Sequence, residues 1–368
     1  MPHDIFKMGR CPKPRDICGQ DDAMSRVYLD HNATTPLRIE ARDAMITAMD
    51  VVGNPSSVHA EGRAAKNVLE DARLAVAASL GAGNADVFFV SGATEAAALV
   101  MAGRDLHGSG LEHAAVAAWI TPSLDVVDGA VVVNDPARST VQLANSETGI
   151  VQALADGLAV SDLTQGFGKV PFAYEWSGVE TVFLSAHKFG GPKGVGAIVV
   201  PKGQDVAAQI KGGGQEMGRR SGTENLIGIA GFAAAATAAQ RDLANGIWDR
   251  VAHLRNILEK VIEDADCHTI LVGKDAQRLP NTSCFIAPGW KGETQVMAMD
   301  LAGFAVSAGS ACSSGKVKAS PVMGALGFNA EEASCALRIS LSPQTTEQDV
   351  LGFADAWTRK RVKMLERI

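Results

Sequence analysis

Short apolar runs alternate with helical patterns along most of the chain. Runs rich in β-branched and aromatic residues predict strands at residues 87–90, 130–133, 141–143 and 197–200. Apolar positions at helical spacing predict an amphipathic helix over residues 63–80, ended by Gly81, and a long alanine-rich helix over residues 226–245. This alternation predicts an α/β fold whose sheet is largely parallel and lies between helices.

The pattern changes after Asn245. A polar-faced helix is predicted over residues 247–264, followed by further strands and a last amphipathic helix that begins at Glu347. The apolar residues of that helix share one face and are Val350, Phe353, Ala354 and Trp357. We therefore expect a second, smaller α+β domain.

These patterns also predict the domain boundaries. We expect residues 37–244 to form the large domain, and residues 26–36 together with 245–368 to form the small one. Residues 1–25 are polar and contain Pro12 and Pro14, so they are expected to be a disordered extension.

Composition restricts the class of protein. The 368 residues are 46% hydrophobic and 20% charged, which is typical of a globular enzyme. The formal net charge is −7, which gives no electrostatic reason to expect binding to nucleic acid or to an anionic membrane. The longest nearly apolar run, residues 226–239, is too short to span a bilayer.

The N-terminus and the cysteines indicate the compartment. No hydrophobic signal core is present at the N-terminus, and six scattered cysteines in a chain of this length do not make a disulfide framework. Cys11 and Cys18 lack the further partners of a metal site, so none is expected. We therefore expect a cytoplasmic protein.

Two predicted strand ends carry residues suited to a ligand. Residues 91–95 (SGATE) open a helix directly after a strand, where free N–H groups and the helix dipole favour phosphate. Asp162 and Gln165, in DLTQ, follow a short predicted strand at residues 157–160, and a carboxylate there can pair with a protonated ring nitrogen. Each motif alone is also typical of an ordinary helix N-cap.

Lys188 and Cys312 are the candidate reactive groups. Lys188 lies in LSAHKFGGPKG, and a partly desolvated lysine near other cations can form a Schiff base, although a surface lysine is the alternative. Ser185 and His187 are spaced to hold a phosphate beside it. Cys312 lies in AGSACSSG, where small residues predict an accessible loop, while a small buried thiol is the alternative.

Taken together and in order, these segments resemble the cysteine desulfurases of the nitrogen-fixation and housekeeping group (NifS/IscS-like). These enzymes belong to the class V aminotransferase family of fold-type I pyridoxal-phosphate enzymes. The matching segments are LDHNATTP (29–36), GNPSSVH (53–59), SGATE (91–95), EH (112–113), NSETGIVQ (145–152), DLTQ (162–165), SAHKFGGPKGVG (185–196), GGGQE (212–216), RRSGTEN (219–225), AGSACSSGK (308–316) and LRISL (337–341). The resemblance implies a large domain with a mostly parallel, seven-stranded type of sheet between helices, and a small domain that carries the catalytic cysteine loop.

The resemblance implies a role for each matching residue. Lys188 would hold pyridoxal phosphate as a Schiff base, and Asp162 would bind the pyridine nitrogen and so make the ring an electron sink. His113 would stack on the ring and serve as an acid/base group, and Gln165 would contact the ring oxygen. The other cofactor-binding residues would be Ala93 and, on the phosphate, Thr94, Ser185, His187 and, across a dimer interface, Thr223.

The resemblance also implies the reaction. Arg338 would bind the substrate carboxylate with its two-pronged guanidinium, a task that lysine performs poorly. Cys312 would attack the sulfur of L-cysteine, which gives L-alanine and a persulfide on Cys312. The persulfide would pass to a sulfur acceptor or an iron–sulfur scaffold protein, and the enzyme would be a homodimer.

Several positions depart from the family pattern. Ser146 stands where the family usually has the second asparagine of Asn-Asn-Glu, which leaves Asn145 as the candidate substrate-binding substitute. The stretches from His113 to Asn145 and from Asn145 to Asp162 span 32 and 17 residues, each about one helix shorter than usual. A parallel crossover needs roughly a dozen residues, so the fold can survive with a covering helix thinned or missing.

Two alternative functions stay open. One is a selenocysteine lyase or another class V pyridoxal-phosphate lyase. The other is a diverged, weakly catalytic dimeric partner protein, motivated by Ser146 and the two short stretches. Retention of the main catalytic set favours the active enzyme, and its members are Lys188, Asp162, His113, Cys312 and Arg338.

Overall fold

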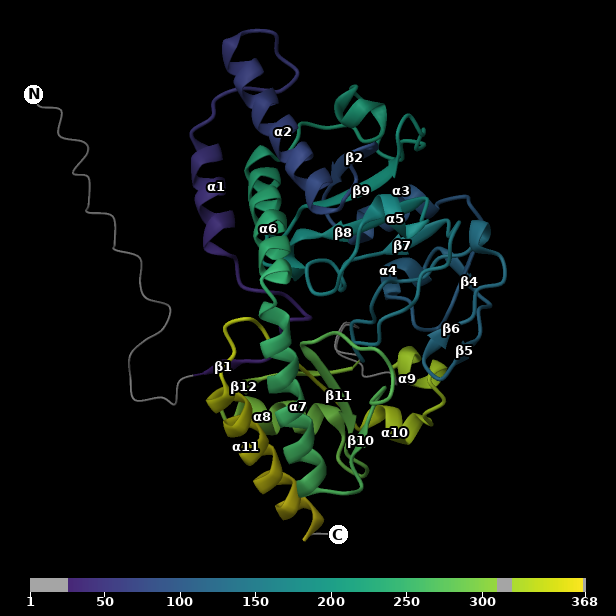
Figure 1. The fold of residues 1–368 in the computed structure, drawn as a ribbon, viewed down its shortest axis with the longest axis vertical. Coiled ribbons are helices and arrows are strands. Elements are labelled where there is room, and N and C mark those ends of the chain that lie inside the picture. The colour runs from purple at the N-terminus through teal and green to yellow at the C-terminus, as the bar shows by residue number, and fades with distance from the viewer. Residues whose placement is uncertain (1–25, 310–319, 367–368) are drawn as a thin grey trace, which may run out of the picture.

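The structure is a computed structural model that describes residues 26–309 and 320–366. The predictions for residues 1–25 and for Cys312 lie outside the described residues. Figure 1 shows one group of strands and helices in its upper half and a second in its lower half. α6 (Leu226–Ala244) continues almost directly into α7 (Ile247–Ala265), and this column connects the two halves.

The upper half contains the predicted sheet. Its four-stranded part has the order β2–β9–β8–β7, in which β7 and β8 are parallel and β9 is antiparallel to both its neighbours. Parallel bridges from Val160 to Thr140 and from Ser139 to His107 extend the order to the parallel pair β3–β4. The strands are β2 (Ala85–Val90), β9 (Gly196–Pro201), β8 (Thr181–Ser185), β7 (Val160–Asp162), β3 (Leu106–Gly108) and β4 (Ile120–Pro122).

This order confirms the predicted fold class. Counting the bridging segment 139–140 as one strand, the described residues make a seven-stranded arrangement in which β9 alone runs against the others. The strand predicted at residues 141–143 adjoins that bridge, since the amide of Leu143 donates to the carbonyl of Asp162 at 2.9 Å.

The strand predicted at residues 130–133 is shorter and pairs differently from a strand of the main sheet. β6 (Ala130–Val131) forms an antiparallel hairpin with β5 (Val126–Val127). Asp128 and Gly129 both have positive φ, at 50° and 83°, which is the backbone of a two-residue hairpin turn. The turn therefore sets the pairing of this apolar run.

Alternating residues of the sheet face two layers of helices. Val87 and Phe89 of β2 pack into the core beneath α2 and α6, whereas Phe88 and Val90 pack against α3 on the other face. Figure 1 shows α1, α2 and α6 side by side along one side of this sheet. The helices and 3₁₀ turns are α1 (Ile39–Met49), α2 (Ala60–Ser79), α3 (Ala93–Met101), α4 (Ala114–Ala117), α5 (Tyr174–Ser177), η1 (Pro136–Arg138), η2 (Ala186–Lys188) and η3 (Gln215–Gly218).

The lower half has its own antiparallel sheet, of order β10–β11–β14–β13. β1 (Val27–Tyr28) joins this half because it pairs in parallel with β12. Its other elements are β10 (Ile270–Leu271), β11 (Thr282–Ile286), α8 (Gly292–Asp300), β12 (Phe304–Ala305), β13 (Ser307–Ala308), α9 (Pro321–Ala325), α10 (Ala330–Ser334), β14 (Ala336–Ser340) and α11 (Glu347–Leu365). The predicted apolar face of α11 is buried. The domain boundaries themselves stay a prediction.

The two short stretches lack long helices, as predicted. Between β3 and the bridge at residue 139 lie the four-residue α4, the β5–β6 hairpin and η1. Residues 145–159 contain no helix. Within residues 26–309 and 320–366, no helix has both the length and the apolar character needed to cross a bilayer.

Arg73 forms ion pairs with two glutamates, one buried and one exposed to solvent, so the contributions of a buried and an exposed ion pair to stability can be compared at one residue. The Glu216 side chain is 2% exposed and accepts from Arg73 and from the amide of Phe89, whereas the Glu70 side chain is 48% exposed. We expect Glu216→Gln to lower the free energy of unfolding by about 2 kcal/mol, because it leaves Arg73 without its buried counter-charge. Glu70→Gln is the matched control and should change it by less than about 0.5 kcal/mol. Urea unfolding measures the change in free energy for both variants. Equal losses of stability would contradict the prediction that the buried ion pair contributes more than the exposed one.

Candidate active site

Lys188 lies at the end of β8, in the short turn η2. Its amine donates to the carbonyls of Asn32 and Ala33, at 2.6 and 3.0 Å. The hydroxyl of Thr35 donates to the Lys188 carbonyl at 3.1 Å, and the amide of Thr35 donates to the His187 carbonyl at 2.9 Å. The segment after β1 therefore encloses Lys188, which is half-buried and not an ordinary surface lysine.

Asp162 and His113 are close enough to Lys188 for their charges to interact. Asp162 ends β7, is buried, and accepts a hydrogen bond from the amide of Thr164 at 2.8 Å. Burial raises the pKa of Asp162, and the charges of His113 and Lys188 oppose that shift. Loss of hydration lowers the pKa of His113, while the Asp162 carboxylate acts to raise it. His113 also caps α4, because its Nδ1 accepts from the amide of Ala115 at 3.1 Å.

Gln165 connects to the same backbone as Lys188. Its Nε2 donates to the carbonyl of Asn32 at 2.8 Å, so this one oxygen accepts from both side chains. Three predicted site residues from two strand ends therefore come together: Asp162 and Gln165 after β7, and Lys188 after β8.

The start of α3 has the character of an anion site. Gly92 is its N-cap and supplies no side-chain acceptor for the first-turn N–H groups, which include those of Ala93 and Thr94. The hydroxyl of Ser185 is 3.6 Å from where a side chain on Gly92 would begin. His187 is held by a contact of its Nδ1 with the Thr34 hydroxyl at 3.1 Å. Burial, with help from Lys188 and Lys193, lowers the pKa of His187 to about 4.

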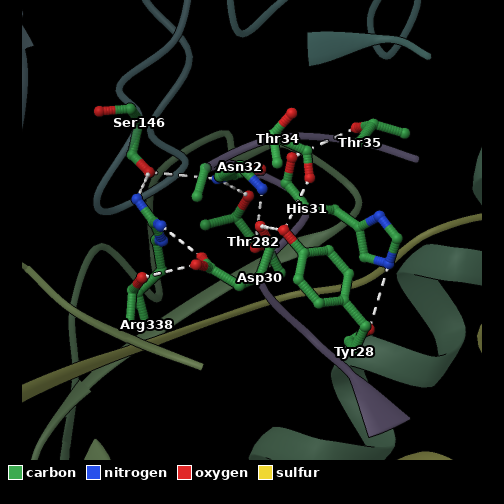
Figure 2. A network of polar contacts seen from close by, with 12 residues as sticks. Tyr28, Asp30, His31, Asn32, Thr34, Thr35, Ser146, Thr282 and Arg338 are labelled. Carbon is green, nitrogen blue, oxygen red and sulfur yellow. Dashed lines mark hydrogen bonds and ion pairs between the residues drawn. The ribbon is translucent and has the colours of Figure 1, made fainter. Parts of the chain in front are cut away.

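Arg338 is held by a polar network that Figure 2 shows from close by. Its guanidinium pairs with Asp30 at 2.6 Å and donates to the carbonyl of Ser146 at 3.0 Å. Asp30 in turn accepts from the hydroxyl of Ser307 at 2.8 Å. Among the described residues, the buried Nε of Arg338 has no hydrogen-bond partner. A donor of the guanidinium is thus left for a further acceptor.

The Ser146 carbonyl, not its side chain, makes the contacts at the unusual position 146. That carbonyl also accepts from the side chain of Asn32 at 3.1 Å. Any residue supplies such a carbonyl, which explains why serine is compatible with this network. The side chain of Asn145 forms the turn itself: its Oδ1 accepts from the amides of Glu147 and Thr148, and its Nδ2 donates to the Leu111 carbonyl. A substrate-binding role for Asn145 stays a prediction.

Two predicted site residues, Thr223 and Cys312, are not among the described residues that come together around Lys188. Thr223 is exposed on the segment between η3 and α6, and its contact across a dimer stays a prediction. Cys312 lies in the undescribed residues 310–319. Of the cysteines that the structure describes, Cys267 is exposed, whereas Cys284 and Cys335 are buried. Burial raises the pKa of the Cys284 thiol to about 12, which makes it a poor nucleophile.

Three ionisable residues near the site were not predicted, of which Glu112 and Lys169 are buried and Glu147 is half-buried. Glu112 precedes His113, and burial raises its pKa to about 8. Glu147 accepts from Ser320 at 2.6 Å, and burial raises its pKa to about 7. Lys169 follows Gln165 by four residues, and burial lowers its pKa to about 7. The sequence feature that could have identified these three residues is that each lies within four positions of a predicted site residue.

The sequence profile of the aminotransferase class V family matches residues 27–118 and 132–353 of the chain. The protein belongs to this family. The interruption of the match, residues 119–131, covers β4, β5 and β6 and lies within the first short stretch.

Within this family, the chain is similar to cysteine desulfurases and NifS-like proteins. A cysteine desulfurase of Cereibacter sphaeroides is 37% identical, over 89% of this chain and 93% of the relative. A cysteine desulfurase of Frankia sp. (strain EuIK1) is 38% identical, over 93% of each chain. The solved structure of a NifS-like protein from Rickettsia africae ESF-5 superimposes with a TM-score of 0.83 at 30% identity, over 92% of this chain and 99% of that one.

Glu112 gives a pH-dependent prediction for stability. Burial raises its pKa from an ordinary value of 4.5 to about 8, so between these values the folded protein holds a proton that the unfolded chain releases. The free energy of unfolding should therefore fall as pH rises through this interval, by up to about 1.4 kcal/mol per pH unit from this group. Glu112→Gln should remove the contribution of this residue to the fall in the free energy of unfolding with pH.

Urea unfolding at pH 5 and pH 8 tests this prediction. Glu112→Gln should gain stability relative to the wild type as pH rises, and Glu331→Gln, at an exposed position on α10, serves as the control. Parallel pH dependence in the wild type and Glu112→Gln would show that burial of Glu112 has no such effect.

Proposed function

We propose that the protein is a pyridoxal-phosphate-dependent cysteine desulfurase. The observation that carries the proposal is the convergence of Lys188 and Asp162, at the ends of β8 and β7, with His113 at the start of α4, close enough for the charge of Lys188 to act on the pKa of both Asp162 and His113. Its relatives named cysteine desulfurase match nearly the whole chain.

The donor set fits the cofactor. The first turn of α3, which has no side-chain cap, and the hydroxyl of Ser185 suit a phosphate. The buried carboxylate of Asp162 suits a protonated pyridine nitrogen, and the half-buried amine of Lys188 suits the carbonyl carbon. When bound, pyridoxal phosphate supplies an electron sink that stabilises negative charge at the substrate Cα.

The chain's own residues then divide the work. Arg338 would hold the carboxylate of L-cysteine, with Asp30 fixing the guanidinium plane. Lys188 would take the Cα proton, and His113 would serve as an acid/base group. The Cys312 thiolate would attack the substrate sulfur: an S–S bond forms, the Cβ–S bond breaks, and its electron pair takes a proton at Cβ. The products are L-alanine and a Cys312 persulfide.

We also propose a cytoplasmic homodimer that passes the sulfur to an acceptor or iron–sulfur scaffold protein. Exposed apolar side chains gather on α1, α2 and the segment between them, and such a face favours contact with another protein surface. They are Ile39, Ile46, Met49, Val52, Val58 and Leu74. The cysteines that the structure describes are free thiols, in keeping with a reducing compartment.

Incubation with L-cysteine, followed by mass spectrometry of the peptide that carries Cys312, tests the proposal. The wild type should gain one sulfur atom on Cys312 and release L-alanine. Cys312→Ser should lose alanine release from cysteine, and Cys267→Ser, at an exposed thiol, is the matched control. Lys188→Ala should lower turnover by about a hundredfold or more.

The outcomes separate the alternatives. Bound pyridoxal phosphate without a persulfide on Cys312 would contradict the desulfurase mechanism. Alanine release from selenocysteine alone, unaffected by Cys312→Ser, would favour a selenocysteine lyase. A wild type that binds no pyridoxal phosphate would favour a non-catalytic partner protein.

A further inference from the structure

Lys169 is a buried lysine beside the candidate cofactor site. Its residue is 4% exposed, and its amine donates to Oε1 of Gln165 at 3.0 Å. Among the described residues, its amine has no carboxylate partner, and the charged groups that bear on it, Lys188 and Arg338, are both cationic. A buried amine among cations is unfavourable for stability alone, and methionine would fill the same space at a lower cost.

The turn that carries Lys169 is rigidly placed. The indole N–H of Trp248 donates to the carbonyl of Gly168 at 2.6 Å and so ties the turn to α7. Gly168 has a φ of 71°, and a side chain there would begin 2.7 Å from the Cβ of Ala239 on α6. The amine of Lys169 is therefore presented to Gln165 by a turn that two helices hold in place.

The contacts of Gln165 fix which way its amide points. Lysine only donates hydrogen bonds, so the atom facing Lys169 must be the acceptor Oε1. The carbonyl of Asn32 only accepts, so Nε2 must face it, at 2.8 Å. A reversed amide would set donor against donor at Lys169 and acceptor against acceptor at Asn32. Nε2 uses one hydrogen for Asn32, and within residues 26–309 and 320–366 its second hydrogen has no acceptor and can donate to a ligand.

We propose that Lys169 is a positioning residue of the cofactor site: it locks Gln165 as a hydrogen-bond donor toward the cofactor and places a positive charge behind Lys188. The inference rests on the proposed function, because the ligand that receives the Gln165 donor is the ring oxygen of pyridoxal phosphate. The hydrogen bond from Gln165 and the charge of Lys169 should both lower the pKa of the group that Lys188 forms with the cofactor. A donor to the ring oxygen and a nearby cation each disfavour an additional proton on the group formed by Lys188 and the cofactor.

The surrounding titratable groups agree with this arrangement. Lys169 and Lys188 line the same small cavity together with His31 and Arg38. His31 has a pKa lowered to about 4, chiefly by burial and also by Lys169, and Arg38 is paired with Asp242 at 2.6 Å. The charge of Lys188 also bears on the pKa of Asp162, His113 and His187. Burial lowers the pKa of Lys169 to about 7, so the ammonium form, which can only donate to Gln165 and carries the charge, is the form present below that pH.

The test is a pH titration of the visible absorption of the full-length protein loaded with pyridoxal phosphate. Lys169→Met removes the donor and the charge, and Lys169→Gln keeps a donor without the charge. We expect the apparent pKa of the visible band to rise by about one unit in Lys169→Met and by less in Lys169→Gln. Lys260→Met, at an exposed position on α7, is the control and should titrate like the wild type.

A double variant tests whether Lys169 acts through Gln165. The pH shift of Lys169→Met combined with Gln165→Ala should be smaller than the sum of the two single shifts. The proposal is overturned if Lys169→Met titrates like Lys260→Met. If Lys169→Met does not fold, an unshifted Lys169→Gln overturns it.

The test also distinguishes this inference from the proposed function. A wild type that develops no visible band with pyridoxal phosphate overturns both. A wild type with a normal band and unshifted Lys169 variants overturns the role of Lys169 alone.

Discussion

The hydrogen bonds of residues 30–35 hold the candidate site together. The carbonyl of Asn32 accepts from Lys188 and Gln165, while its side-chain amide donates to the carbonyl of Ser146. Asp30, two residues earlier, pairs with Arg338. Because this segment continues from β1, which pairs with the lower half of the molecule, it ties the upper sheet to the strand that carries Arg338. Buried polar groups that share partners in this way depend on one another, so the lysine and the arginine are positioned by the same few residues.

Burial brings the pKa of two groups near this segment close to neutral pH, that of Glu112 to about 8 and that of Lys169 to about 7. Burial raises the pKa of Asp162 and of Glu112, and it lowers the pKa of Lys169. Each group is thereby moved away from its ordinary titration range, toward its uncharged form. Such shifts destabilise the fold slightly but cluster where proton transfer is needed, which is the pattern of an active site more than of a structural core.

Periodicity in the sequence predicted the elements whose burial is decided locally. The helix over residues 226–245 and the apolar face of the last helix follow from spacing alone, because an amphipathic helix must bury one stripe. The run at residues 130–133 has the composition of a core strand, yet the turn at Asp128 sends it into a local hairpin. The positions of Asp162 and Lys188 at strand ends could be anticipated. The burial of Lys169 could not, because its neighbours Gly168 and Gln165 are held by Trp248 and Asn32, which are distant in the sequence.

Side-chain hydrogen bonds attach the first short stretch to the neighbouring strands without a long helix. In the first short stretch, the side chains of Gln142 and Asn145 both donate to the carbonyl of Leu111. The amide of Gln142 donates to the carboxyl of Glu112 at 2.9 Å. Residues 111–113 are thereby attached to the sheet edge beside β7, from which Asp162 emerges. These hydrogen bonds hold Leu111 and Glu112, and His113 follows them directly in the chain. The position of His113 beside Asp162 therefore coincides with a stretch held by side-chain hydrogen bonds and not by a long helix.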